Sequence, residues 1–411
     1  MTAPATAHEP NLCDEWAASG EAWAEIAALL EKNYAYPDRV ADFDALLENA
    51  GRSASTAENL NDLATIAEKL GYAVRDGHFH LSPSPQPERA WIPSASDFWV
   101  ARDDDGTFTV VDVRMGSSAD RAGFRPGTRV TAVGGVVLDV ASGELLAPVV
   151  GDPTGEQLAY AANVLLAGKL RTERTVTILD GSGERTITLP AGYSSLPERP
   201  AEPVSAFDDG GVVRFRFNNS LGADDDGNYP AIAAFDRLML EHGGADAIIL
   251  DLRDTPGGGD TVVLRAVLGH FVRTASAYQI HRNHWASAVH GVPREYVEYV
   301  QPRGTRYTGQ LVVLSGLWTG SVGEALAVAL SQVAGSHSIG TGQADLLGDL
   351  RQTTSQNGCL TVNLAWDRLY APDGTAREDW LPAMQLPSAD LDVDGSDPAM
   401  AAAKAYLAGL D

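Results

Sequence analysis

Ser321 stands between an apolar run and a helical pattern, a place where a serine can do chemistry. The run "QLVVLSG" reads as a buried strand, and "SVGEALAVAL" has the apolar spacing of a helix. Free N–H groups of Val322 and Gly323 at such a helix start can face a developing negative charge. The serine is either a nucleophile or only the helix cap, with Glu324 at the capping-box spacing. This stretch alone favours the cap.

A nucleophilic serine needs a base, and lysine and histidine are the usual ones. The lysines are few: Lys32, Lys69, Lys169 and Lys404. None lies between Ser321 and the last helix, so a serine–lysine pair is disfavoured. Among the nine histidines, those of "DGHFHL" differ from the rest, because His78 and His80 would share one face of an extended segment. This motif alone favours a buried structural histidine over a catalytic one, and a metal site lacks a third ligand at a diagnostic spacing.

A glycine triplet, Gly257 to Gly259, follows another apolar strand pattern in "IILDLRDTPGGGD". Glycines let backbone N–H groups turn toward a ligand or an oxyanion without side-chain obstruction. A tight strand-to-helix turn explains the triplet equally well. The stretch lacks the Lys-Ser/Thr pair of a phosphate loop.

The elements that must position these residues fall into three predicted regions. Residues 1–84 carry helical spacing, and residues 85–198 read as strands with hairpins and one helix. From 199 to 411 strands and helices alternate, which predicts a mainly parallel sheet with helices on its faces. In open sheets of this kind, sites form beyond the carboxyl ends of the strands. The fold class is therefore multi-domain α+β with an α/β core.

Composition restricts the partners and the location. A formal net charge of -25 over 411 residues disfavours nucleic acid and anionic membranes as partners. No run approaches the about 18 apolar residues of a membrane span. The two cysteines, Cys13 and Cys359, match neither a disulfide framework nor a zinc pattern. With no signal-peptide pattern at the N-terminus, a cytoplasmic protein is expected. The oligomeric state stays open.

The order of several motifs resembles the tail-specific (C-terminal processing) serine peptidases, especially the branch with the tricorn core and the retinoid-binding repeats. The motifs are "YAYPD", "RDGHFHL", "GSSADRAGFRPGTRVTAVGGVVL", "GVVRFRFNNS", "ADAIILDLRDTPGGG", "TGSVGEALAVAL", "GSHSIGTGQADLLGD" and "RLYAPDGTAREDWLPAM". The resemblance covers roughly residues 20 to 395. It implies a core of crotonase-like ββα units and a PDZ-like domain over residues 85–198. Such a domain would bind an extended peptide along a sheet edge, or serve as a spacer without a ligand.

The resemblance implies a role for each matching residue. Ser321 matches the nucleophile and His78 the general base. Glu378, in "PDGTAREDWLP", matches the acid that orients this histidine. The oxyanion hole would combine the amide of Val322 with one from Gly257 or Gly258.

Glu324 and His80 are accessory candidates, and at two positions the chain departs from the family's pattern. Glu324 matches the acid of the family's Ser-x-x-Glu pattern, its role left open, and His80 is a second accessory candidate. Thr255 stands where the family often has Asn, and Ala383 where Asp is expected. These departures bear on Glu378 more than on Ser321.

We therefore expect a serine hydrolase, most of all a peptidase, that uses a Ser-His-Glu site and an acyl-enzyme without cofactor or metal. Its substrate would be a peptide or a small acyl compound. One alternative is an ester or amide hydrolase or a cyclase of a biosynthetic pathway. Another is a non-catalytic binding protein on the same fold, against which the presence of both Ser321 and His78 argues.

Overall fold

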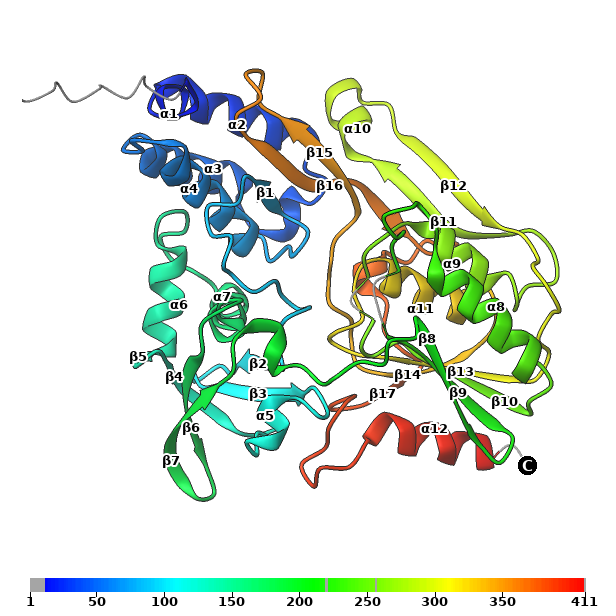
Figure 1. The fold of residues 1–411 in the computed structure, drawn as a ribbon. Coiled ribbons are helices and arrows are strands. Elements are labelled where there is room, and N and C mark those ends of the chain that lie inside the picture. Colours follow the sequence, from blue (N-terminus) through cyan, green and yellow to red (C-terminus); the bar gives the residue numbers. More distant parts are fainter. Residues whose placement is uncertain (1–11, 219–220, 256, 410–411) are drawn as a thin grey trace, which may run out of the picture.

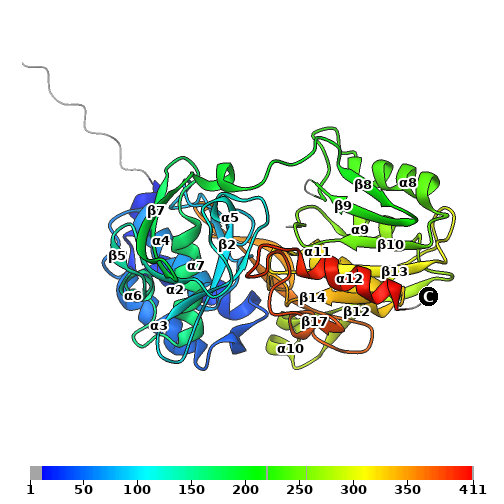
Figure 2. The ribbon, with the colours of Figure 1, turned by 90° about the horizontal axis from the view of Figure 1, so that it is seen from below.

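The computed structural model describes residues 12–218, 221–255 and 257–409. Figure 1 shows a cluster of N-terminal helices, a β-rich unit below it and a larger sheet-and-helix core at the side. This arrangement confirms the prediction of a multi-domain fold that mixes helices and sheets. The view from below in Figure 2 separates the core from the other two parts. No described helix has the length and apolarity that a bilayer crossing requires.

The N-terminal helices pack through their apolar faces. They are α1 (Leu12–Ala17), α2 (Gly20–Asn33), α3 (Phe43–Ala54) and α4 (Leu60–Ala73), with the 3-10 turn η1 (Pro37–Arg39) between α2 and α3. Side chains at the N-caps set two of the helix starts: Asp42 accepts the N–H of Ala45, and Asn59 accepts that of Asp62. The cluster shares its core with residues of a distant strand, β16 (Thr361–Tyr370). Helix α4 belongs to this shared hydrophobic core, and the segment that carries His78 follows it directly in the chain.

The β-rich unit is a sheet of order β2-β3-β4-β6-β7, with β5 beside β4. Its strands are β2 (Phe98–Arg102), β3 (Phe108–Val113), β4 (Arg129–Val133), β5 (Val136–Val137), β6 (Arg174–Asp180) and β7 (Gly183–Leu189); its helices are α5 (Ser118–Arg121), α6 (Leu138–Leu146) and α7 (Gly155–Ala167), followed by the 3-10 turn η2 (Gly192–Ser195). The hairpins predicted around Gly106 and between β6 and β7 are both present.

Helix α7 lies along the edge strand β2 of this unit. The side-chain amide of Asn163 accepts the N–H of Val100 at 2.9 Å and donates to its carbonyl at 2.8 Å. Asn163 is 1% exposed. The middle of the β2 edge therefore has its main-chain groups satisfied by this side chain.

The core holds a six-stranded sheet of order β17-β14-β13-β10-β9-β8. Its strands are β8 (Val204–Asp209), β9 (Val212–Phe217), β10 (Ala247–Asp251), β13 (Gln310–Ser315), β14 (His337–Gly340) and β17 (Met384–Gln385). All neighbours run parallel except β8, which forms a hairpin with β9.

Helices cover both faces of this sheet. One face carries α8 (Pro230–His242), α9 (Thr261–Leu268) and α11 (Val322–Gln332), and the other carries α12 (Pro398–Ala408). Side chains alternate along β10: Ile248 and Leu250 join the first helices, whereas Ala247 and Ile249 face α12. A strand buried on both faces reads as a continuous apolar run, which explains the pattern "AIIL".

A second sheet of the core brings the N-terminal region to the site. Its order is β1-β16-β11-β12, with β15 also paired to β16. The further elements are β1 (His80–Ser82), β11 (Ser276–Asn283), α10 (His284–His290), β12 (Arg294–Val300), β15 (Asp349–Thr354) and the 3-10 turn η3 (Arg377–Asp379). The pair His80 and Asn363 begins the antiparallel β1–β16 ladder. The segment with His78 is thus anchored to a strand far along the chain.

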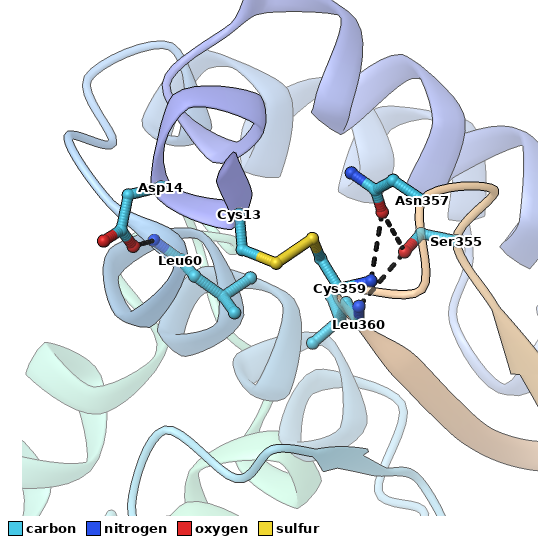
Figure 3. The surroundings of a disulfide bond; sticks show 7 residues. All are labelled: Cys13, Asp14, Leu60, Ser355, Asn357, Cys359 and Leu360. Carbon is cyan, nitrogen blue, oxygen red and sulfur yellow. Dashed lines mark hydrogen bonds between the residues drawn. A yellow bond between two sulfur atoms is a disulfide. The ribbon is translucent and has the colours of Figure 1, made fainter. Parts of the chain in front are cut away.

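A disulfide joins Cys13 of α1 to Cys359, in the turn between β15 and β16 (Figure 3). The number and spacing of the two cysteines indicate no disulfide framework, so this bond is a finding of the structure. Their sequence separation of 346 residues carries no local signal. Packing of the N-terminal helices against β16 brings the two residues together.

Candidate active site

Three loops that follow adjacent parallel strands meet at the site. Strand β13 lies between β10 and β14. The loop after β10 carries the glycine triplet, the loop after β13 carries Ser321, and the loop after β14 carries Leu346 and Leu347. Because the carboxyl ends of parallel neighbours lie at one edge of a sheet, these loops converge there.

Ser321 adopts a backbone conformation that is rare for a residue with a side chain, with φ 53° and ψ -114°. Its N–H donates to a carboxylate oxygen of Glu324 at 2.6 Å. The preceding Gly320 donates its N–H to the carbonyl of Thr255 at 3.0 Å. These bonds hold the turn at the start of α11, where Ser321 and Glu324 also form the reciprocal contacts of a capping box.

His78 faces this hydroxyl. Its Nε2 lies 3.1 Å from Oγ of Ser321, and its Nδ1 lies 2.7 Å from the carbonyl oxygen of Leu347. A carbonyl only accepts, so Nδ1 carries the proton and Nε2 presents a lone pair to the serine. Burial lowers the pKa of His78 to about 4. The ring is therefore neutral at pH 7 and able to take a proton.

Glu378 does not orient His78 in this structure, although the sequence resemblance implied that it would. Among the described residues, the partner of the His78 Nδ1 is the carbonyl of Leu347. Glu378 is half-buried in η3, where burial raises its pKa. The role expected of its carboxylate is filled by the main chain of the loop after β14.

Glu324 and Arg377 brace that loop instead. Glu324 is buried and accepts N–H groups of Ser321 and Leu346. Burial raises its pKa to about 8, although Arg377 lies 3.8 Å away. Arg377 in turn donates to the carbonyl of Leu346. The acid whose role the sequence left open therefore links the nucleophile turn to the loop that holds His78.

The predicted oxyanion residues surround the serine. Val322 is the first residue of α11, so its N–H has no partner inside the helix. Val322 and Gly258 line the cavity in front of Ser321. Gly257, with φ 91°, packs directly against Ser321, because a Cβ on it would be 2.6 Å from the Cβ of the serine. Of the two glycines, Gly258 is the one that faces the cavity.

The cavity in front of the pair has a volume of about 640 Å³, which suits a peptide side chain with its flanking backbone. His80 also lines it; its Nδ1 approaches the carbonyl of His78 at 2.9 Å, and its ring meets Trp91 edge-on. Apolar, aromatic and polar residues all line this cavity. They include Trp91, Tyr193, Tyr296, Leu350, Gln279, His281, Glu298 and Asp349.

His281 and Asp349, which line the cavity, come within metal-binding reach of each other and of Asp367. The ligand atoms of His281, Asp349 and Asp367 lie within 4.8 Å of one another. The guanidinium of Arg351 already contacts both carboxylates, at 3.3 and 3.0 Å. A cationic side chain therefore balances these acids.

One positioning group carried no signal that residue types could give: Leu347 acts through its carbonyl, which any residue supplies. Asp76, in "RDGHFHL", is of a residue type that suggests a local role in positioning the backbone. Its contacts reach further, to Tyr34 after α2 and to the loop after β14. Sequence reasoning finds side chains with chemistry and misses main-chain partners.

Residues 225–380 match the family model described as Peptidase family S41. The chain carries a peptidase family S41 domain. The match includes Ser321, Glu324, the glycine triplet and Glu378, and His78 lies ahead of it in the sequence. It confirms the resemblance to the C-terminal processing peptidases and the prediction of a serine peptidase. No curated protein matches the chain.

Several solved structures resemble this chain over most of its length. The photosystem II D1 C-terminal processing protease is 17% identical with a TM-score of 0.56, covering 91% of this chain and 95% of its own. Mature CPAF is 15% identical with a TM-score of 0.60, covering 93% and 94%. A putative peptidase from Parabacteroides merdae is 13% identical with a TM-score of 0.54, covering 97% of both chains. At these identities the likeness concerns the fold.

Proposed function

We propose that the protein cleaves peptide bonds with Ser321 as nucleophile and His78 as general base. The observation that carries the proposal is the 3.1 Å approach of His78 Nε2 to Ser321 Oγ at the start of α11. His78 takes the hydroxyl proton while Oγ attacks the scissile carbonyl, and the C–N bond breaks as His78 returns the proton to the leaving amine. Water then attacks the acyl-enzyme by the same route.

The amides of Val322 and Gly258 hold the negative oxygen of the tetrahedral intermediate in this mechanism. Both residues line the cavity beside Ser321. The helix start adds the positive end of the α11 dipole, and each preorganised donor is worth about 100-fold or more in rate. We assign the role to Gly258 rather than Gly257, because Gly257 lies against the Cβ of Ser321.

We also propose a PDZ-like identity for the sheet β2–β7 with α7, supported by the helix beside its edge strand. For the location, the Cys13–Cys359 disulfide favours a compartment in which thiols oxidise over the cytoplasm expected from the sequence. The family match and the aromatic side chains among the residues that line the cavity support a peptide substrate.

A fluorophosphonate probe tests the nucleophile without knowledge of the substrate. The wild-type protein and a Ser182→Ala control, whose serine lies in the exposed β6–β7 turn, should be labelled on Ser321. Ser321→Ala should lose both labelling and hydrolysis of unstructured peptides while keeping its melting temperature. Labelling that persists in Ser321→Ala would exclude this serine as the nucleophile, and turnover of small acyl esters alone would exclude a peptidase.

A further inference from the structure

We infer that Asp76 is a positioning residue for the general base, because one carboxylate fixes both ends of the hydrogen bond that holds the His78 ring. This inference rests on the Ser321–His78 mechanism proposed above. Asp76 lies two residues before His78 and is 1% exposed. Its Oδ1 accepts the backbone N–H of His78 at 2.9 Å.

The same carboxylate reaches the residue whose carbonyl orients the imidazole. It accepts the backbone N–H of Leu347, while the carbonyl of Leu347 receives the Nδ1 proton of His78 at 2.7 Å. His78 and Leu347 are 269 residues apart in sequence. The two loops contact each other through their own hydrogen bond and through Asp76, so the carboxylate closes a ring of contacts around the base.

The remaining contact ties this ring to the N-terminal helices. The hydroxyl of Tyr34, just after α2, donates to Oδ2 of Asp76 at 3.2 Å. Two of these three donors are N–H groups, which cannot accept, and the ionised carboxylate satisfies all three donors at once. Protonation would remove the negative charge that strengthens these hydrogen bonds and so loosen the segment that carries His78.

Burial raises the pKa of Asp76 to about 7, and its three hydrogen-bond donors together with Arg39 oppose that rise. The titratable and charged groups around Asp76 come from several elements: Tyr34 and Tyr36 after α2, Arg39 of η1, Tyr160 of α7 and His78 itself. The pKa of His78 is lowered to about 4. Loss of reactivity on acidification should therefore follow the carboxyl of Asp76 near pH 7, well before the imidazole titrates.

The rate of fluorophosphonate labelling of Ser321 between pH 5 and 9 tests this role in the full chain. Asp76→Asn should slow labelling at pH 8 by about 100-fold, the scale of a small misplacement of a catalytic group, and should remove the step near pH 7. Asp42→Asn, which keeps a helix cap with the same chemical change, should behave like the wild type. Scanning calorimetry checks that each variant melts as a folded protein.

Tyr34→Phe is the second variant, because it leaves the carboxylate in place. It removes a donor that stabilises the ionised form, so the acid limb of labelling should move to higher pH. An unshifted limb, or an Asp76→Asn protein labelled within about threefold of wild type, would overturn the positioning role. Absence of labelling in the wild-type protein would instead remove the nucleophile itself, an outcome distinguishable from a failure of Asp76.

Discussion

Nδ1 of His78 donates to the main-chain carbonyl of Leu347 at 2.7 Å, so the backbone of a neighbouring loop holds the general base. The loop is itself braced by Glu324, Arg377 and Asp76. A carbonyl fixes the ring and its tautomer as a carboxylate does, but it adds no full negative charge next to the imidazolium. This difference decides what individual substitutions should do.

Glu378→Gln should leave catalysis largely intact. Because Glu378 makes no hydrogen bond to His78 among the described residues, we expect kcat/KM to fall less than about tenfold, against about 100- to 10,000-fold for His78→Ala. Hydrolysis of one peptide substrate by both variants gives the comparison. Equal losses in the two variants would show that the carboxylate acts directly on the base.

Gly257→Ala should abolish activity. A Cβ there would lie 2.6 Å from both the Gly320 carbonyl oxygen and the Cβ of Ser321, and the φ of 91° disfavours any side chain. Gly127→Ala is the control, since its φ of 89° is similar and nothing lies within 4 Å of the added atom. Kinetics and melting temperatures of the pair separate backbone strain from the clash. An active Gly257→Ala protein would contradict the close approach.

Much of the fold follows from patterns that the sequence displays. Apolar runs locate β10 and β13, and helical apolar spacing locates α11, each within a few residues of its observed bounds. A strand buried on both faces is apolar along its length, and a helix that covers it is apolar on one face. Ser321 and His78 could be singled out as candidates because their side chains can carry the chemistry, and the resemblance to the family then implied their roles as nucleophile and base. A histidine base became the favoured choice only after a serine–lysine pair was disfavoured. None of the four lysines lies between Ser321 and the last helix.

The positioning groups could not be predicted in the same way. The Leu347 carbonyl has no residue signature, and the Cys13–Cys359 pairing depends on how α1 packs near the β15–β16 turn. The Nδ1 of His78 bonds the Leu347 carbonyl and not Glu378, and no motif could show this, because a motif gives the order of residues and not the direction of a side chain. Contacts between loops far apart in sequence exist only once the sheets have formed.

Glu324→Gln should change how stability depends on pH. Burial raises the folded pKa of Glu324 from its ordinary 4.5 to about 8. Between these values the folded state binds more protons than the unfolded state, so this carboxyl lowers stability as pH rises, by about 1.4 kcal/mol per pKa unit. Glu324→Gln should therefore gain stability relative to wild type from pH 5 to 8 and then level off. Urea unfolding across this range measures the difference, and a constant difference would contradict the raised pKa.

Removing the disulfide should destabilise the N-terminal helices and leave the serine reactive. Cross-links that close long loops are worth about 2–4 kcal/mol through the unfolded state, and this one joins α1 to the turn beside β16. Cys13→Ser with Cys359→Ser should melt at lower temperature than the oxidised wild type, and reductant should bring the wild type toward the variant. Thiol titration of the unreduced, denatured protein should find no free cysteine. Two free thiols would contradict the pairing.

Asn163 should keep extended peptides off the β2 edge. Its side-chain amide bonds both main-chain groups of Val100 and also donates to the carbonyl of Ala159, so its donors and its acceptor are used. A peptide that added a strand beside Val100 would have to displace this buried amide, at a cost of about 1–3 kcal/mol for each polar group left unpaired. In hydrogen exchange the Val100 N–H should be protected in the free protein and unchanged by excess unstructured peptide.

Asn163→Ala opens this edge, and Gln157→Ala is its control on the same helix. Gln157 is a buried amide that bonds Ala73 and the start of α7, away from β2. Both variants should lose stability, but only Asn163→Ala should lose protection at Val100 and regain it when peptide is added. Peptide-dependent protection of β2 in the wild-type protein would show that the edge accepts a peptide strand. The β-rich unit would then be a peptide-binding site, and Asn163 would not block its edge.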